Sequence, residues 1–184
     1  MNQQQNQDTS NKGLFGLVGG IFIGISATLL SFTQGHEGVR YAAYLDTGRV
    51  PTICYGHTKG VAMGMTATKA QCDKWLIEDL QIAQQGVRKH LKVPVNRNQI
   101  DAYTDFVFNV GEKAFADSTM LRKANAGDRE GSCKEFLRWV YVGKLDCRLS
   151  SSRCSGIPKR RDAEFDLCLR PNNEVIQPWK PQVK

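Results

Sequence analysis

The chain has 184 residues, of which 41% are hydrophobic and 23% are charged, a composition that suits one folded domain with short appendages. Its formal net charge of +7 favours an anionic partner: a nucleic acid, an acidic lipid or a negatively charged cell wall. The basic residues are scattered, however, and the sequence has no compact zinc-finger, homeodomain or aromatic RNA-binding motif, so we expect no nucleic-acid partner.

The N-terminal region divides into a polar tail, residues 1–12, and an apolar segment, residues 13–32. The tail has the composition of a disordered segment. The apolar segment has no charged residue, and as a helix it would span about 30 Å, the thickness of the hydrocarbon core of a bilayer. It is rich in glycine, serine and threonine, so lipid would hold it only weakly.

Three interpretations of residues 13–32 compete: a cleaved signal peptide, a permanent anchor, and an anchor that can leave the membrane. A thin charged region before the segment and the lack of an Ala-x-Ala site after it disfavour a signal peptide. Its Gly-x-x-x-Gly pairs could pack against a partner helix in a permanent anchor. The small and polar residues favour a releasable anchor, and Lys12 then places the N-terminus in the cytoplasm and the rest of the chain outside.

Six cysteines in a small chain with a membrane-type N-terminus suggest disulfide bonds formed in an oxidising compartment. The candidates are Cys54, Cys72, Cys133, Cys147, Cys154 and Cys168. Many pairings are possible, so the connectivity stays open, although the four cysteines between residues 133 and 168 indicate local cross-links. The cysteines form no Cys-x-x-Cys pair and the histidines lie elsewhere, so we expect no metal site and no cofactor.

Residues 32–60 carry the chemically informative pattern. Glu37 lies at the end of a predicted helix that carries it. An alternating run then ends at Asp46 in a turn signal, and a second run with β-branched and aromatic residues contains Thr52. We therefore expect a β-hairpin or three-stranded sheet, with Asp46 at a strand end and Thr52 on the next strand. Folding the hairpin back would bring Glu37, Asp46 and Thr52 around one cleft.

Two carboxyl groups in one cleft suit the hydrolysis of a glycosidic bond. One carboxylic acid must keep its proton near neutral pH and donate it to the leaving oxygen. The second must stay ionised and serve either the cationic sugar centre or an attacking water. An apolar pocket favours the protonated form, and a polar setting favours the charged form.

The spacing Glu, eight residues, Asp, five residues, Thr, followed by Gly-His, resembles the catalytic core of phage-type lysozymes. The resemblance extends over residues 33 to about 170. It implies that Glu37 is the general acid, that Asp46 positions and polarises the nucleophilic water or stabilises the cationic centre, and that Thr52 helps to hold this water. The family is regarded as inverting, which implies carboxyl groups roughly 6.5–9.5 Å apart.

The same resemblance assigns supporting residues. It implies that His57 supports the cleft, whereas Cys54 departs from a glycine often found there and is interpreted as half of a disulfide. Asn109 matches a family position at which a polar residue faces the substrate. The Pro-x-Arg-Arg-x-x-Glu run resembles the family's terminal helix, in which an arginine reaches the catalytic glutamate; Arg160 is the best match and Arg161 the next.

The rest of the sequence predicts a mainly helical lobe, from apolar residues at helical spacing and from capping signals. The expected helices start at Thr66 or Thr68, at Asn96 with Gln99 in a capping box, at Ser118, at Arg129 and at Pro158. The helix over residues 129–143 should turn Phe136, Leu137 and Val140 inward. The expected fold is α+β and mainly α: a β-hairpin lobe and a helical lobe joined by a long helix, with an N-terminal apolar helix.

These expectations combine into an endolysin that hydrolyses the β-1,4 bond between N-acetylmuramic acid and N-acetylglucosamine in peptidoglycan and lyses the host cell. The expected organisation is a tail (1–12), a releasable signal anchor (13–32), a lysozyme domain (33–170) and an extended tail (171–184). Its partners would be bacterial peptidoglycan and the host inner membrane, from which it would pass into the periplasm as a monomer.

Two alternatives stay open. The first is a membrane-tethered peptidoglycan-binding protein without catalysis, which the intact Glu/Asp/Thr set disfavours. The second is a lytic transglycosylase, which needs one acid and no ordered water and is disfavoured by Asp46 and Thr52.

The distance along the chain between the apolar segment and Glu37 suggests how the enzyme is regulated. Glu37 lies five residues beyond residue 32, so its helix would be misplaced or unformed while residues 13–32 are in lipid. This arrangement resembles endolysins with a signal-arrest-release segment. Those that use thiol exchange carry a cysteine in the segment; this one has none, which favours a conformational switch.

Overall fold

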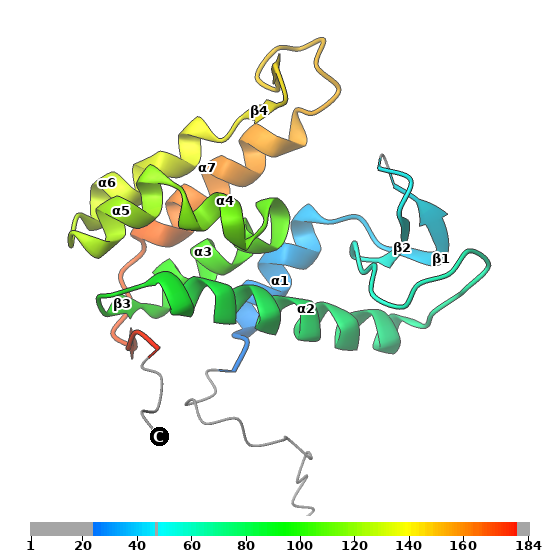
Figure 1. Cartoon of the computed structure of the whole chain (residues 1–184), viewed down its shortest axis with the longest axis horizontal. Helices are drawn as coiled ribbons and strands as arrows, with labels where there is room; N and C mark the ends of the chain where they lie inside the picture. The colour runs from blue at the N-terminus through cyan, green and yellow to red at the C-terminus, as the bar shows by residue number, and fades with distance from the viewer. Residues whose placement is uncertain (1–23, 47, 180–184) are drawn as a thin grey trace, which may run out of the picture.

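The computed structural model describes residues 24–46 and 48–179, which form a helical lobe and a small β-lobe joined by a long helix (Figure 1). The expected fold class, α+β and mainly α, is confirmed. The expected polar tail (1–12) and most of the expected anchor (13–32) lie outside the described residues. Within residues 24–46 and 48–179, no helix combines the length and the apolar character needed to cross a membrane.

The helical elements are α1 (Ala27–His36), α2 (Lys69–His90), α3 (Arg97–Val110), α4 (Glu112–Ala116), α5 (Thr119–Asn125), α6 (Arg129–Lys134), the 3-10 helix η1 (Glu135–Arg138) and α7 (Gly156–Leu169). The strands are β1 (Arg40–Leu45), β2 (Pro51–Cys54), β3 (Val95–Asn96), β4 (Tyr141–Val142), β5 (Leu145–Asp146) and β6 (Val175–Ile176). The strands pair antiparallel as β1–β2, β3–β6 and β4–β5.

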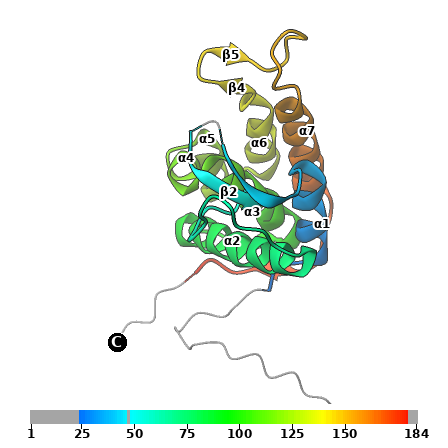
Figure 2. The ribbon, with the colours of Figure 1, turned by 90° about the vertical axis from the view of Figure 1, so that its right-hand side faces the viewer.

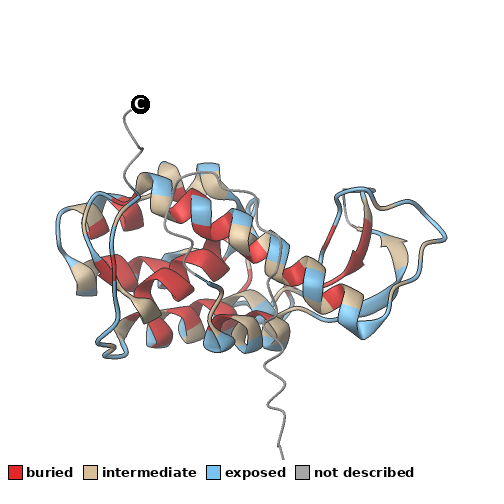
Figure 3. Cartoon of the chain, turned by 90° about the horizontal axis from the view of Figure 1, so that it is seen from below, coloured by how far each residue is buried: buried red, intermediate tan, exposed pale blue. Residues whose placement is uncertain are grey.

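Helix α3 runs through the centre of the helical lobe and packs against α2 on one side and α7 on the other. The core around it is built from aromatic side chains with no exposed surface, among them Tyr103, Phe106, Phe115 and Phe136. Figure 3 shows that the buried positions of the helices face the inside of this lobe. Because α3 is buried along most of its length, its polar side chains must find partners within the protein.

A second, smaller core joins the β-lobe to α1 and α2. Its fully or almost fully buried members include Leu29 of α1, Ile53 of β2, and Leu76 and Leu80 of α2. Leu29 belongs to the segment that the sequence predicts as a membrane anchor. In this structure, therefore, the end of that segment is part of the folded domain.

The β-lobe has the expected hairpin and a third extended segment beside it. In the hairpin, Tyr44 pairs with Thr52. The third segment is held by two backbone hydrogen bonds of 2.8 Å, from Ala43 N to Met65 O and from Ala67 N to Tyr41 O. Because Thr66 lies in this extended segment, α2 begins after Thr68, whose side chain accepts a hydrogen bond from Gln71 N.

All six cysteines form disulfides, as predicted, and the structure decides the pairing. Cys54–Cys72 joins β2 to α2, Cys133–Cys168 joins α6 to α7, and Cys147–Cys154 closes the loop before α7. The expected cross-links between residues 133 and 168 are thus confirmed. Figures 1 and 2 show that the β4–β5 hairpin and this loop project beyond the N-terminal end of α7, on the side away from α2.

The prediction of one helix over residues 129–143 is wrong. The helix tightens into η1 and ends at Arg138, and β4 and β5 follow as a hairpin. Val140, Tyr141 and Val142 include two β-branched residues and an aromatic, which favour a strand, and Gly143 has a φ of 58°, which suits a tight turn. Phe136 and Val140 are buried as expected, whereas Leu137 is exposed.

The C-terminal residues that the structure describes, up to 179, lie against the helical lobe. Val175 and Ile176 pair with Asn96 and Val95, respectively, and Ile176 is buried. Because β3 directly precedes α3, this pairing covers the start of the central helix.

Candidate active site

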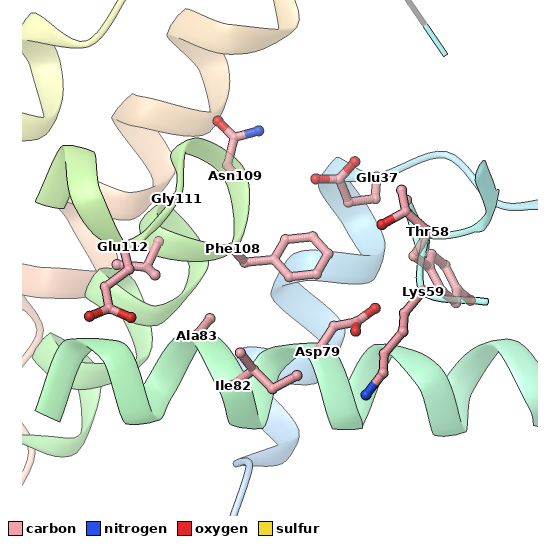
Figure 4. Close-up of a pocket in the computed structure, with 13 residues that line it drawn as sticks. Glu37, Thr58, Lys59, Asp79, Ile82, Ala83, Phe108, Asn109, Gly111 and Glu112 are labelled. Atoms are coloured by element: carbon pink, nitrogen blue, oxygen red, sulfur yellow. The ribbon is translucent and has the colours of Figure 1, made fainter. Parts of the chain in front are cut away.

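A cleft of about 470 Å³ lies between the two lobes (Figure 4). It is lined by Glu37, Tyr55, Gly56, Thr58, Lys59, Asp79, Ile82, Ala83, Val107, Phe108, Asn109, Gly111 and Glu112. The lining combines carboxylates, an amide, a lysine and the ring of Phe108. Such a mixture of polar groups and an aromatic surface suits a sugar chain, which presents both hydroxyls and apolar ring faces.

Glu37 lies at the cleft because α1 ends there. Its backbone N–H caps the helix by donating to Thr33 O at 2.9 Å, and its side chain keeps about a quarter of its surface exposed. Arg160 donates from Nη1 to Glu37 Oε1 at 2.5 Å. The expected contact between an arginine of the terminal helix and Glu37 is therefore present, and Arg160 makes it.

Arg160 is held in place by a buried carboxylate on α3. Its Nε and Nη2 donate to the two oxygens of Asp105 at 2.8 and 2.9 Å, and Thr33 donates to Asp105 Oδ1 at 2.7 Å. Burial by itself raises the pKa of Asp105, but the bonds and charge of Arg160 hold the net pKa below its usual value. Burial also opposes the charge of Arg160, yet Asp105 and Glu37 raise its pKa. Both groups are charged, and they join α1, α3 and α7 behind Glu37.

Asp46 and Thr52 lie together at the base of the β1–β2 hairpin tip. Val50 N donates to Asp46 Oδ1 at 2.8 Å, and Thr52 Oγ1 donates to Val50 O at 2.9 Å. The backbone of Val50 thus orients both side chains. Asp46 and Thr52 are not among the residues that line the cleft described above. The residues after β2 that line it are Tyr55, Gly56, Thr58 and Lys59.

Cys54 adopts a backbone conformation that glycine usually occupies. Its φ is 59°, in the left-handed region, where a Cβ atom is unfavourable. The disulfide with Cys72 ties this strained position to α2.

His57 supports the loop between β2 and the cleft. Its Nδ1 lies 2.8 Å from Asp79 Oδ2 on α2, its Nε2 lies 3.0 Å from Lys59 O, and its ring stacks on Trp75 with 4.8 Å between centroids. Both ring nitrogens are occupied by protein partners and the residue is buried. These contacts fix the loop against α2 and leave His57 little access to a ligand.

A family model for phage lysozyme matches residues 34–164. The chain belongs to the phage lysozyme family. It is 37% identical over 156 residues to a SAR-endolysin of Bacteriophage PS119, covering 83% of this chain and 89% of that protein. It is 35% identical over 162 residues to a SAR-endolysin of Enterobacteria phage P21, covering 86% and 94%. A crystal structure of a P22 lysozyme mutant matches with a TM-score of 0.69 at 36% identity, covering 80% of this chain and 99% of that one.

As a phage lysozyme, the chain is a glycosidase-type enzyme that acts on bacterial peptidoglycan. The resemblance that the sequence carried around Glu37 is thereby confirmed at the level of the family. The possibility of a wall-binding protein without catalysis is not favoured.

Sequence reasoning missed the partners behind the cleft of this phage lysozyme. Asp101, Asp105 and Asn109 follow one another at intervals of four residues on α3, so they lie on one face of the helix. The two aspartates are completely buried. Two acids and an amide on one face of a helix that is predicted to be buried could have indicated that cationic or hydroxyl partners lie against it.

Proposed function

We propose that this phage lysozyme is an endolysin that hydrolyses the β-1,4 bond between N-acetylmuramic acid and N-acetylglucosamine, with inversion at the anomeric carbon. Glu37 donates the proton to the leaving oxygen, Asp46 polarises the attacking water and Thr52 holds that water. The observation that carries the proposal is the position of Glu37, at the end of α1 and in the cleft next to the β-lobe.

The hydrogen bonds of Asp46 and Thr52 are compatible with these roles. Asp46 uses Oδ1 to accept from Val50, and among the described residues Oδ2 has no hydrogen-bond partner, so it is free to accept from a water. Thr52 gives its only hydrogen to Val50 O and keeps its lone pairs for a donor. A water that donates to both groups would be oriented with its lone pair toward the sugar.

The contact with Arg160 must change during the reaction. A guanidinium stabilises the charged form of Glu37, whereas a general acid must carry a proton when the sugar bond breaks. A bound glycan that reaches Glu37 Oε1 would displace or screen Arg160. The strong bonds between Arg160 and Asp105 give the guanidinium a second partner when this happens.

Purified peptidoglycan tests the proposal directly. Glu37→Gln should lower the rate of hydrolysis by roughly a hundredfold or more, because it removes the proton donor. Glu130→Gln, which changes an exposed glutamate on α6, is the control and should keep full activity. Analysis of the products should show new reducing ends with inverted anomeric configuration. Anhydro sugars would indicate a lytic transglycosylase, and full activity of Glu37→Gln would exclude the proposed role of Glu37.

We further propose that residues 13–32 anchor the enzyme in the host inner membrane and that it reaches the periplasm after release. The contacts of the last part of this segment support a switch. Ser26 Oγ donates to Asp101 Oδ2 at 2.6 Å, Arg97 donates to Gly24 O at 3.2 Å, and Leu29 is fully buried. Because these residues cannot lie in lipid and make these contacts simultaneously, the contacts support a release step between the membrane-bound and the folded enzyme.

The release proposal predicts that activity depends on the state of the membrane. Full-length protein in energised vesicles should cleave externally added glycan slowly, and depolarisation should raise the rate. Replacing Gly19 and Gly20 by leucine should strengthen the anchor and prevent this rise, while activity in detergent stays normal. Equal rates before and after depolarisation would contradict the proposal.

A further inference from the structure

Asn109 and Glu37 lie on opposite sides of the cleft, with the ring of Phe108 between and below them (Figure 4). Asn109 is the exposed residue of the last turn of α3, whereas most of that helix is buried. In Figure 4, its amide nitrogen points to the side on which Glu37 lies, and its amide oxygen points away. This orientation determines which chemical group the protein offers to a ligand at this position.

The orientation of the amide is decided by Arg161. Arg161 Nη2 lies 3.0 Å from Asn109 Oδ1. A guanidinium has only donors, so the atom that faces it must be the amide oxygen. The amide nitrogen is therefore directed away from Arg161, and among the described residues it donates to no protein group.

Arg161 is itself held firmly. Only 1% of its surface is exposed, its Nη2 also donates to Glu164 Oε1 at 2.8 Å, and its guanidinium lies over the ring of Phe106 at 5.0 Å from the centroid. Burial lowers the pKa of Arg161 and raises the pKa of Glu164, so the pair occupies its site at a cost in solvation. Glu164 and the ring of Phe106 therefore fix the position of Nη2, the atom of Arg161 that contacts the amide oxygen of Asn109.

We infer that Arg161 is a positioning residue, which fixes the amide of Asn109 so that Nδ2 donates into the cleft to an oxygen acceptor of the bound glycan. The acceptor is the carbonyl oxygen of an N-acetyl group on a sugar ring, which can accept a hydrogen bond but cannot donate one. The two orientations of an asparagine amide have nearly the same shape but present opposite hydrogen-bonding groups. By excluding one of them, Arg161 gives the cleft a fixed donor on the side opposite Glu37. The inference rests on the proposed function, because it takes the cleft as the glycan site.

The first test measures KM and kcat on soluble peptidoglycan fragments. Asn109→Ala removes one neutral hydrogen bond and should raise KM roughly threefold to tenfold, with kcat nearly unchanged. Asn109→Asp should raise KM further, because one carboxylate oxygen keeps the bond to Arg161 and the other meets the sugar oxygen as a second acceptor. A KM for Asn109→Asp equal to that of the unaltered enzyme would overturn the inference.

The second test separates positioning from a structural role. Arg161→Gln should raise KM like Asn109→Ala, and the two changes together should raise it no more than Asn109→Ala alone, because both act through one amide. Since Arg161→Gln leaves Glu164 buried without a charged partner, the pair Arg161→Gln/Glu164→Gln provides a second variant in which both charges are removed. Lys159→Gln, an exposed change on the same helix, is the control and should leave KM unchanged.

The outcomes distinguish this inference from the proposed function. If KM effects of Arg161 and Asn109 changes multiply independently, Arg161 does not act through the amide and the inference fails. If Glu37→Gln is inactive while Asn109 and Arg161 variants keep their KM, the proposed function stands without this inference. If Glu37→Gln is active, the proposed function fails whatever the KM values are.

Discussion

Arg160 Nη1 lies 2.5 Å from Glu37 Oε1, although the two residues are 123 positions apart in the chain. The contact joins the end of α1 to the first turns of α7, with Asp105 of α3 on the other side of the guanidinium. The proposed acid is therefore oriented by elements from both ends of the catalytic domain. A substitution that shifts α1, α3 or α7 should therefore change the position of the Glu37 side chain.

Removing one partner of the buried ion pair between Arg160 and Asp105 should destabilise the protein more than removing both, because a single charge would then stay buried without a partner. Arg160→Met leaves the completely buried Asp105 without its charged partner and should lower the free energy of unfolding by about 3–5 kcal/mol. The double change Arg160→Met/Asp105→Leu should cost less than the sum of the single changes. Urea denaturation of the four proteins in the cycle measures the coupling. Additive effects would show that the pair is not coupled.

The hydrogen bond from Thr33 to Asp105 should fix the position of α1 and therefore the position of Glu37 at its end. Thr33→Val keeps the shape of the side chain but removes its hydrogen bond to Asp105, so we expect a loss of about 1–2 kcal/mol in stability and a lower rate of hydrolysis. Thr28→Val makes the same chemical change at an exposed position of the same helix and serves as the control. If the two variants unfold at the same urea concentration and have equal activity, the connection is absent.

Asp101 should make the protein more stable in mild acid. Burial raises its pKa to about 6, despite its hydrogen bond from Ser26 and the charge of Arg97. The folded state then holds a proton that the unfolded state, with the ordinary value of 3.8, has released. Its contribution to stability is full below pH 3.8 and is lost as the pH rises through 6. The difference corresponds to a change on the order of 3 kcal/mol.

The variant Asp101→Asn isolates this contribution, because its amide oxygen can still accept from Ser26. The free energy of unfolding of the unaltered protein minus that of Asp101→Asn should fall between pH 4.5 and pH 7.5 in urea titrations. A difference that is constant over this range would contradict the raised pKa.

The backbone at Cys54 should favour glycine once the disulfide is removed. With Cys72→Ala as background, Cys54→Gly and Cys54→Ala differ only in the Cβ atom at a φ of 59°. We expect the glycine protein to be more stable by about 1 kcal/mol, because a Cβ is unfavourable in this conformation. Both should be less stable than the unaltered protein by about 2–4 kcal/mol, since the disulfide between residues 54 and 72 is missing. Thermal unfolding of the three proteins provides the comparison.

Features that depend on neighbouring residues could be predicted from the sequence. The capping box of Asn96 and Gln99 and the cap at Ser118 form as expected, because a cap needs only residues within one helical turn. The hairpin that carries Asp46 and Thr52 also depends on a short stretch of chain. The motif that first indicates the family resemblance lies in this same stretch, although the resemblance extends to about residue 170.

Features that join distant segments were decided by the tertiary structure. No local pattern specifies that Cys54 pairs with Cys72, that Asp105 holds Arg160, or that Arg161 turns the amide of Asn109. These contacts form only after α1, α3 and α7 have packed together, because burial then removes water as the competing partner of each polar group. The sequence by itself thus determined most of the helices, the β1–β2 hairpin and the catalytic candidates. Packing decided which buried groups orient those candidates and where the helix after Arg129 gives way to the β4–β5 hairpin.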